Sequence, residues 1–376
     1  MHLYVHIPFC LRRCSYCDFS IAVRKRIPAE EYVDAVLKEI GQRAAVPSGD
    51  VVETLYLGGG TPSLLPPEAI AELLRELTRL FRVPTSALRT DVEVTLEANP
   101  EDVTPDRASA WRAAGVNRVS LGAQSFDDRV LQWMHRSHDA ARIGAAVHAL
   151  RGAGIDNISL DLIFALPSEL GRDWARDLDM ACSLLPAHLS LYGLTVEPRT
   201  PLDRWISRGA VHPPNEERYA DEYLLAHRRL TADGFQFYEV SNAARTGSRS
   251  RHNSAYWSGR PYLGLGPAAH SFDGRARRWN LSAWEAYRRA VAAGRSPVES
   301  EEVLTPEQQE LERIYLALRT AEGLPLTARP PDGLTALTAS GWVAVTGDRL
   351  RCTPEGWLRL DELVAKLFAT KGLSLS

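Results

Sequence analysis

The chain has 376 residues, of which 45% are apolar, and its 44 Lys and Arg against 47 Asp and Glu leave a formal net charge of −3. This is the composition of a folded globular protein and excludes disordered, collagenous and low-complexity chains. No apolar run approaches the ~18 residues of a membrane span, so we expect no integral membrane segment, which leaves peripheral membrane contact open. The first nine residues lack a basic start and a cleavage site, and we expect a cytoplasmic protein.

Three of the five cysteines fall within eight residues, at Cys10, Cys14 and Cys17. An odd cluster cannot pair within itself, and a long chain in a reducing compartment needs no disulfide framework. The cluster therefore indicates metal or redox chemistry. We expect Cys182 and Cys352 to be small buried apolar residues, because each lies among apolar neighbours.

Residues 2–196 repeat one pattern, in which a short β-branched or apolar run is followed by a loop and a segment with helical spacing. Six such units in series predict a parallel sheet. The predicted strands are Leu3–Ile7, Val52–Leu57, Val92–Leu96, Arg118–Leu121, Ile158–Ile163 and Leu189–Leu194.

Nearly every predicted strand ends in glycine or in a polar residue. In a barrel the carboxyl ends of successive strands converge on one mouth, whereas an open doubly wound sheet offers mainly its switch point. The recurrence therefore predicts an α/β fold built on a partial (β/α) TIM-like barrel. The residues concerned are Gly58–Thr61, Glu97, Asn99, Gln124, Ser125, Asp161, Tyr192 and Gly193.

The pattern changes after residue 200, where we expect a helix over Glu216–Ala232 and a strand over Gln236–Asn242. A stretch rich in Gly, Arg and aromatic residues follows, and between Asn242 and Arg289 there are nine Arg, no Lys and only two acidic residues. Such a local excess of positive charge is typical either of a solvated surface or of a site for an anionic ligand.

Residues 303–376 predict a small winged-helix-like unit. It would contain a helix over Gln308–Arg319, a short helix, two strands joined by a turn at Gly347–Asp348, and a helix over Pro354–Leu367. Its eight basic and nine acidic residues do not favour a nucleic-acid partner. We therefore expect three domains: a barrel core at 1–200, a basic region completing the barrel at 201–302, and the winged-helix-like unit at 303–376.

The spacing C-x3-C-x2-C suits a cubane 4Fe-4S cluster, because three thiolates leave one iron open to chelate a small molecule. A zinc site with His6 as its fourth ligand is the alternative, since zinc accepts three cysteines and one histidine. The position of the motif at the end of the first predicted strand favours the cluster.

With the aromatic Tyr16, this motif resembles the radical S-adenosylmethionine (SAM) superfamily, in which SAM binds the open iron. The sequence GGGTP at Gly58–Pro62 lacks the lysine of a phosphate-binding P-loop, and in this resemblance it is the glycine-rich turn beside the SAM amine. The likeness covers almost the whole chain and points to the oxygen-independent coproporphyrinogen III oxidases (HemN) and the related heme chaperones (HemW). It rests on HIPFC, LGGGTP, LEANP, SLGAQSF, DLIFALP, LGLGPAAHS and TPEG.

The resemblance implies that Cys10, Cys14 and Cys17 hold the 4Fe-4S cluster. It also implies a set of SAM contacts, several of which are strand-end residues noted above. These are Tyr4, Gly59, Gly60, Thr61, Glu97, Gln124, Arg136, Asp161, Gly193 and His270.

Two features separate this chain from the oxidases of the group. Phe19 stands where they carry a further cysteine, and the sequence begins at the first strand without their amino-terminal extension. The resemblance therefore implies a heme chaperone that hands heme to acceptor hemoproteins, and it assigns no catalytic residue. The alternatives are an oxidase that decarboxylates porphyrinogen propionates and a radical SAM enzyme with another substrate.

The segment HNSAYW, His252–Trp257, matches the HNxxYW pattern of the heme chaperones. Imidazole is a common axial ligand of heme iron, and aromatic rings can stack on a porphyrin. Arginines can pair with its propionates, and Arg249, Arg251 and Arg260 flank the segment. The resemblance thus makes His252 the candidate heme ligand.

Overall fold

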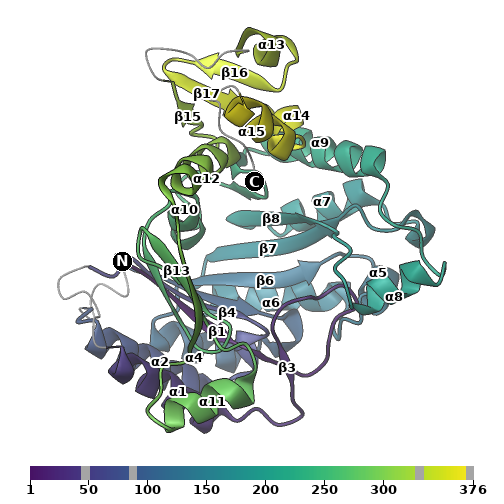
Figure 1. Cartoon of the computed structure of the whole chain (residues 1–376). Helices are drawn as coiled ribbons and strands as arrows, with labels where there is room; N and C mark the ends of the chain where they lie inside the picture. The colour runs from purple at the N-terminus through teal and green to yellow at the C-terminus, as the bar shows by residue number, and fades with distance from the viewer. Residues whose placement is uncertain (44–50, 84–90, 327–333, 370–376) are drawn as a thin grey trace.

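The computed structural model describes residues 1–43, 51–83, 91–326 and 334–369 (Figure 1). Its centre is one large β-sheet. The strands are β1 (His2–Ile7), β4 (Thr54–Gly59), β5 (Glu93–Ala98), β6 (Arg118–Gln124), β7 (Asn157–Phe164), β8 (His188–Gly193), β9 (Gln236–Glu239), β10 (Asn242–Ala244), β11 (Tyr262–Leu265), β12 (His270–Phe272), β13 (Ala276–Asn280) and β14 (Val298–Val303). They lie in the order β14-β13-β12-β11-β1-β4-β5-β6-β7-β8-β10-β9.

The order confirms the predicted partial barrel. Strands β1 and β4 to β8 are parallel neighbours in sequence order, and each overlaps one of the six predicted strands, with bounds that differ by one to three residues. A doubly wound sheet would reverse its order at a switch point. Within the described ranges β14 and β9 end the sheet without pairing with each other, so the barrel is partial.

Helices cover the outer face of the sheet, as expected for βα units. They are α1 (Ala29–Gln42), α2 (Pro67–Leu80), α4 (Pro105–Ala114), α6 (Ala140–Gly152), α7 (Trp174–Ser183), α9 (Glu216–Ala232) and α11 (Trp284–Ala292). Helix α2 buries Ile70, Leu73, Leu74 and Leu77 at helical spacing, which gives it one apolar face. The predicted helix at Glu216–Ala232 is confirmed by α9.

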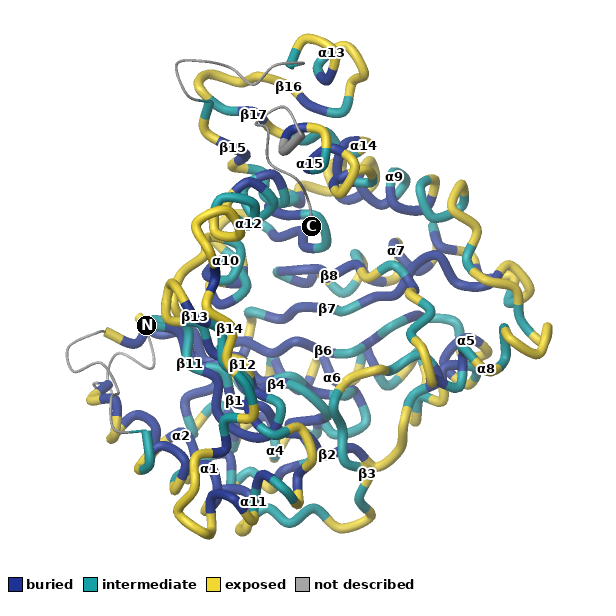
Figure 2. Tube along the Cα trace, viewed as in Figure 1, coloured by how far each residue is buried: buried dark blue, intermediate teal, exposed yellow. Residues whose placement is uncertain are grey.

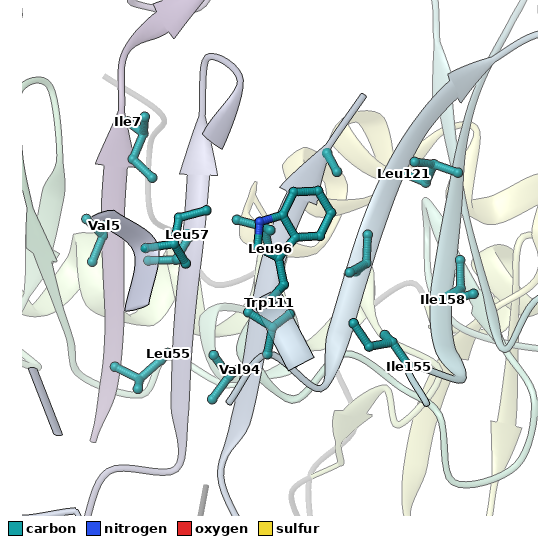
Figure 3. Close-up of a cluster of buried hydrophobic side chains, with 14 of the residues drawn as sticks. Val5, Ile7, Leu55, Leu57, Val94, Leu96, Trp111, Leu121, Ile155 and Ile158 are labelled. Atoms are coloured by element: carbon teal, nitrogen blue, oxygen red, sulfur yellow. The ribbon is translucent and has the colours of Figure 1, made fainter. Parts of the chain in front are cut away.

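The core lies between these helices and the sheet (Figure 3). Side chains of Val5, Leu55, Val94 and Leu121 point to the same side of their strands, and the buried Trp111 of α4 packs among them. Because successive residues of a strand face opposite ways, the alternate residues point into the barrel. Those inner residues are largely polar or aromatic, namely His2, Tyr4, His6, Thr54, Tyr56, Glu93, Thr95, Glu97, Arg118, Ser120, Ser159, Asp161, His188, Ser190 and Tyr192.

Shorter elements connect the units. They are β2 (Phe9–Cys10), β3 (Ala22–Val23), η1 (Pro62–Leu64), η2 (Pro100–Asp102), α5 (Asp128–Trp133), η3 (Ser168–Leu170), α8 (Pro201–Ser207) and α10 (Arg251–Trp257). The strand predicted over Gln236–Asn242 is instead a hairpin of β9 and β10. Ser241 and Asn242 favour a turn, and both donate to the side chain of Glu239.

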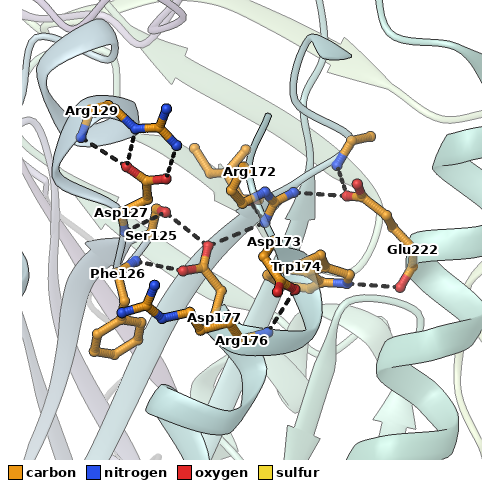
Figure 4. A network of polar contacts seen from close by, with 12 residues as sticks. Ser125, Phe126, Asp127, Arg129, Arg172, Asp173, Trp174, Arg176, Asp177 and Glu222 are labelled. Carbon is orange, nitrogen blue, oxygen red and sulfur yellow. Dashed lines mark hydrogen bonds and ion pairs between the residues drawn. The ribbon is translucent and has the colours of Figure 1, made fainter. Parts of the chain in front are cut away.

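A buried ionic network holds the carboxyl ends of β6 and β7 (Figure 4). The guanidinium of Arg172, fully buried, lies 2.8 Å from the Glu222 carboxylate on α9 and 3.3 Å from that of Asp177 on α7. Asp177 also accepts from Ser125 at 2.8 Å, just after β6, and Glu222 accepts from the backbone of Ala165 at 2.7 Å, just after β7. The network thereby fixes the two strand ends relative to the outer helices.

The C-terminal elements form the predicted winged-helix-like unit, shown in green to yellow at the top of Figure 1. They are α12 (Pro306–Arg319), β15 (Leu324–Pro325), α13 (Leu334–Ala339), β16 (Val343–Thr346), β17 (Arg349–Cys352), α14 (Pro354–Trp357) and α15 (Leu360–Ala369). Their three strands pair in the order β15-β17-β16 beside a separate apolar core that includes Leu318 and Leu363. The single helix predicted over Pro354–Leu367 is divided into α14 and α15.

Burial follows this layering, with β6 to β8 buried and most of β14 exposed at the sheet edge (Figure 2). Two expectations about single residues are wrong, because Cys182 and Cys352 are only partly buried against the core. None of the helices in the described ranges combines the length and apolarity required to cross a bilayer.

Candidate functional site

A first cavity of ≈370 Å³ opens at the carboxyl ends of the parallel strands. Its walls bring together the three clustered cysteines and eight of the ten residues expected to contact SAM. Those eight are Gly59, Gly60, Thr61, Glu97, Gln124, Arg136, Asp161 and Gly193. We call this the cysteine cavity.

The cysteines lie on one loop of the cysteine cavity, which starts at the end of β2. All three thiols are free, and the Cys10 sulfur lies 3.3 Å from the Thr61 hydroxyl oxygen. Arg136 places a guanidinium nitrogen 3.7 Å from the Cys14 sulfur and donates at 2.6 Å to Asn99 after β5. The loop is therefore fixed to the ends of several parallel strands.

The donor set fits an iron–sulfur cluster better than a single metal ion. Burial raises the pKa of the Cys10 thiol and raises that of Cys17 to about 11, so both thiols are protonated without a metal. No group of three or more His, Cys, Asp or Glu in the described ranges has the geometry of an ion site. His6 uses both ring nitrogens, at 3.0 Å from Tyr4 and from the Ser20 carbonyl, which leaves the zinc alternative without its fourth ligand.

The turn after β4 must contain glycine because the chain around Pro8 and Phe9, just before the cysteine loop, lies close against it. A Cβ on Gly60 would lie 2.8 Å from the Pro8 and Phe9 carbonyl oxygens, and a Cβ on Gly59 would lie 2.6 Å from the His6 ring. Gly59 also has φ +115°, a conformation that favours glycine. The turn therefore has glycine for packing reasons, and its backbone lines the cavity.

Two carboxyl groups lie on the floor of the cysteine cavity. Glu97 accepts from the Tyr56 hydroxyl at 2.8 Å and from the Gly59 backbone at 2.9 Å, and burial raises its pKa to about 7. Asp161 accepts from Ser120 at 2.9 Å, and burial raises its pKa as well. Carboxylates held in a dry pocket are suited to a cationic ligand group, which would offset their desolvation.

The other two residues expected to contact SAM, Tyr4 and His270, line a second cavity of ≈1120 Å³. This larger cavity lies between α10, strands β11 to β13 and the C-terminal unit, which contributes residues of α12, β15 and β17. Its aromatic walls include Tyr256, Trp257, Tyr262 and Phe272. We call it the aromatic cavity. Its volume lies just above the ~300–1,000 Å³ of ordinary ligand pockets.

His252 does not line the aromatic cavity. Its side chain is 1% exposed, with Nδ1 at 2.7 Å from the Thr54 hydroxyl and Nε2 at 2.8 Å from the Tyr256 hydroxyl. Burial lowers its pKa to about 3, so the imidazole is neutral. In this arrangement His252 fastens α10 to β4 and orients Tyr256, which does line the cavity.

Positive charge in the aromatic cavity is largely paired. Five arginines and two glutamates line it. Arg249 bonds Glu322 at 2.5 Å, Arg260 bonds Glu53 at 2.9 Å, and two further arginines pair with acids of α12. Arg349 contacts only carbonyl oxygens, at 2.9 Å from that of Gly323, so its charge has no acidic partner within the described ranges. Arg251, which we also expected beside a ligand, is not among the lining residues.

Stacked rings separate the two cavities. The Tyr56 hydroxyl donates to Glu97 in the cysteine cavity, and the Tyr56 ring stacks on His252 with centroids 4.9 Å apart. His252 bonds Tyr256, which faces the aromatic cavity. Four side chains thus connect one ligand-sized space to the other.

Sequence reasoning missed Tyr56 and the contribution of α12. The alternation of β4 could have shown Tyr56, because it lies two residues before Gly58 and on the same face. The α12 residues Glu312, Arg313 and Leu316 line the aromatic cavity, but they belong to a unit interpreted as a separate domain. No local signal in the sequence indicates that it contacts a ligand site of the barrel.

Comparison with known proteins agrees with this architecture. The model of the Radical SAM superfamily matches residues 4–181, and that of the HemN C-terminal domain matches residues 304–359. Coproporphyrinogen III oxidase (HemN) from Escherichia coli, described as a radical SAM enzyme, has a solved structure with a TM-score of 0.81 and 25% identity over 97% of this chain and 89% of that one. Together these likenesses define a radical SAM protein with a HemN-type C-terminal unit.

Several curated relatives carry the name heme chaperone HemW, two of which illustrate the likeness. The one from Mycobacterium tuberculosis (strain ATCC 25618 / H37Rv) is 38% identical over 371 residues, or 97% of this chain and 94% of the relative. The one from Bacillus subtilis (strain 168) is 34% identical over 85% of this chain and 84% of the relative. The chain belongs to the HemW family of radical SAM proteins.

Proposed function

We propose that this protein is a cytoplasmic heme chaperone that holds a 4Fe-4S cluster and SAM in the cysteine cavity, binds heme in the aromatic cavity and transfers it to acceptor hemoproteins. Membership of the HemW family supports the proposal, since the relatives carry that name. The observation that carries it is the aromatic cavity itself, which lies beside the HNSAYW segment and combines aromatic walls with arginines.

The residues of the cysteine cavity suit the two cofactors. The free thiols of Cys10, Cys14 and Cys17 surround a common space and would hold the cluster. When bound, such a cluster supplies an open iron that can chelate a small molecule. Glu97 and Asp161 would bind the cationic groups of SAM, and the backbone of Gly59 and Gly60 allows close approach.

The aromatic cavity suits heme in shape and charge. Tyr256, Trp257 and Phe272 can contact the faces and edge of a porphyrin, and burial of its apolar ring favours binding. Arg349, without an acidic partner, is the natural contact for a propionate. Ligation by His252 stays a prediction, because its imidazole would first have to release Thr54 and Tyr256.

The direct test is hemin titration after anaerobic reconstitution, followed by transfer to an apo-hemoprotein such as apomyoglobin. We expect a Soret shift on binding and recovery of the myoglobin spectrum on mixing. Ser258→Trp, which fills the aromatic cavity, should weaken hemin binding, whereas Thr246→Trp on the exposed loop before α10 should not. Equal hemin binding by wild type and Ser258→Trp would contradict the proposed site.

The structural likeness to HemN keeps the oxidase as the competing function. Phe19, where the oxidases have a further cysteine, is 63% exposed beside the cysteine cavity. We therefore expect no conversion of coproporphyrinogen III to protoporphyrinogen IX under conditions in which an oxidase control is active. Robust turnover by the reconstituted protein would contradict the chaperone proposal and support the oxidase.

A further inference from the structure

We propose that His270 supplies the axial imidazole to the iron of heme in the aromatic cavity. The inference rests on the proposed function, because it names the ligand at that same site. It differs from the expectation drawn from the sequence, which placed His270 beside SAM and made His252 the heme ligand.

The first observation is that His270 has ring nitrogens available to bind iron. His6 and His270 are the two histidines that line the aromatic cavity within the described ranges. Both ring nitrogens of His6 are hydrogen bonded, as are both of the buried His252. The side chain of His270 is exposed, and among the described residues its ring nitrogens have no hydrogen-bond partner. It alone among these three histidines offers a free nitrogen to the cavity.

The second observation is rigid placement. His270 begins β12 and pairs with Trp279 of β13, and the two rings stack with centroids 5.8 Å apart. On the other side, a Cβ on Gly264 of β11 would lie 2.0 Å from the His270 carbonyl oxygen, so only glycine permits this approach. The imidazole is therefore presented from a strand held by both neighbours, as a ligand site requires.

The third observation is the chemical state and surroundings of the ring. Partial desolvation by the cavity walls and the nearby Arg277 guanidinium lower the pKa of His270, which favours the neutral imidazole that binds iron. Phe272, two residues along the same strand, and Tyr262 opposite it also line the cavity. A nitrogen ligand is thus joined to aromatic walls that can hold a porphyrin.

The experiment compares hemin and metal-free protoporphyrin IX binding to wild type and His270→Ala. We expect His270→Ala to lose the absorption and EPR signature of imidazole ligation and to bind hemin about tenfold more weakly. Metal-free protoporphyrin IX should bind both proteins equally, because it makes no axial bond. Added imidazole should restore the ligated spectrum of the variant. His148→Ala on the exposed face of α6 is the matched control and should behave as wild type.

The outcomes separate the inference from the proposed function. If His270→Ala leaves the hemin spectrum unchanged and His252→Ala loses the signature of imidazole ligation, the assignment of His270 is wrong and His252 is the ligand. Equal loss of hemin and protoporphyrin IX by His270→Ala shows a packing role and also overturns the inference. If wild type binds neither compound, the chaperone proposal itself fails, and the assignment of His270 fails with it.

Discussion

The cysteine cavity and the aromatic cavity share one sheet but are built in different ways. The first lies at the ends of consecutive parallel strands, and its acids are buried and hydrogen bonded within it. The second is assembled from the amino-terminal strand, the α10 region and the C-terminal unit, and most of its arginines are exposed and paired. The contrast teaches that consecutive barrel strands define the first site, whereas the second requires segments that are far apart in the sequence.

The largest expected effect is the loss of the cluster from the cysteine cavity, with hemin binding in the aromatic cavity retained. Replacing Cys10, Cys14 and Cys17 together by alanine should abolish bound iron and sulfide after anaerobic reconstitution, because no protein ligand of the cluster is left. Hemin binding should persist, since none of the three lines the aromatic cavity. Mössbauer spectra and hemin titration measure the two results.

The matched control is the double variant Cys182→Ala and Cys352→Ala, whose thiols lie outside both cavities. It should keep the full cluster content. A cluster that survives in the triple variant would remove these cysteines from the site. Loss of hemin binding together with the cluster would mean that the two cavities are not separate sites.

A large loss of stability is expected from the buried ionic network at the carboxyl ends of β6 and β7. Arg172→Ala leaves the buried carboxylate of Asp177 without a cationic partner and Glu222 with Arg218 alone, and it should lower the free energy of unfolding by about 3–5 kcal/mol. Arg129→Ala is the matched control, because it removes an exposed pair with Asp127 worth at most about 1 kcal/mol. Denaturant unfolding of the two variants measures the difference, and equal losses would contradict the structural role of the network (Figure 4).

The carboxyl of Glu97 predicts a pH dependence specific to the first cavity. Its pKa is about 7 in the folded protein and about 4.3 in an unfolded chain. The folded state therefore binds more protons between these values, and this stabilising contribution is present below the unfolded pKa and lost as the pH rises through 7. At about 1.36 kcal/mol per pKa unit, the contribution of Glu97 to the free energy of unfolding should fall by roughly 4 kcal/mol over this pH range.

Glu97→Gln tests that expectation in the ligand-free protein. Unfolding curves at pH 5 and pH 8 should differ less in the variant than in wild type. SAM affinity should rise with pH through 7 in wild type, as the carboxylate forms, and should be about 10- to 100-fold lower in the variant, on the scale of a lost buried contact. Parallel pH profiles for the two proteins would remove Glu97 from both roles.

The smallest expected effect concerns the second cavity. Arg260→Ala removes an exposed ion pair with Glu53 and should change the free energy of unfolding by less than about 1 kcal/mol. Thermal unfolding at low and high salt measures it. A loss several times larger would show that the paired arginines hold the aromatic cavity together and do not only line it.

The sequence predicted the barrel and the cysteine cavity well, because both depend on local signals. Strand periodicity, the glycine turn at Gly58–Gly60 and polar residues such as Glu97 at strand ends all follow from one βα unit at a time. The aromatic cavity depends on contacts between distant segments. The burial of His252 against Thr54 and the approach of α12 to α10, where Arg319 lies 4.2 Å from the centroid of the Trp257 ring, have no local signature.

The rings between the cavities have a thermodynamic consequence. Tyr56 bonds Glu97 on one side and stacks on His252 on the other, and His252 bonds Tyr256. If a ligand bound in the cysteine cavity shifts these stacked rings, it changes the affinity of the aromatic cavity for its own ligand. Because such a coupling free energy is reciprocal, the second ligand must then change the affinity for the first by the same factor.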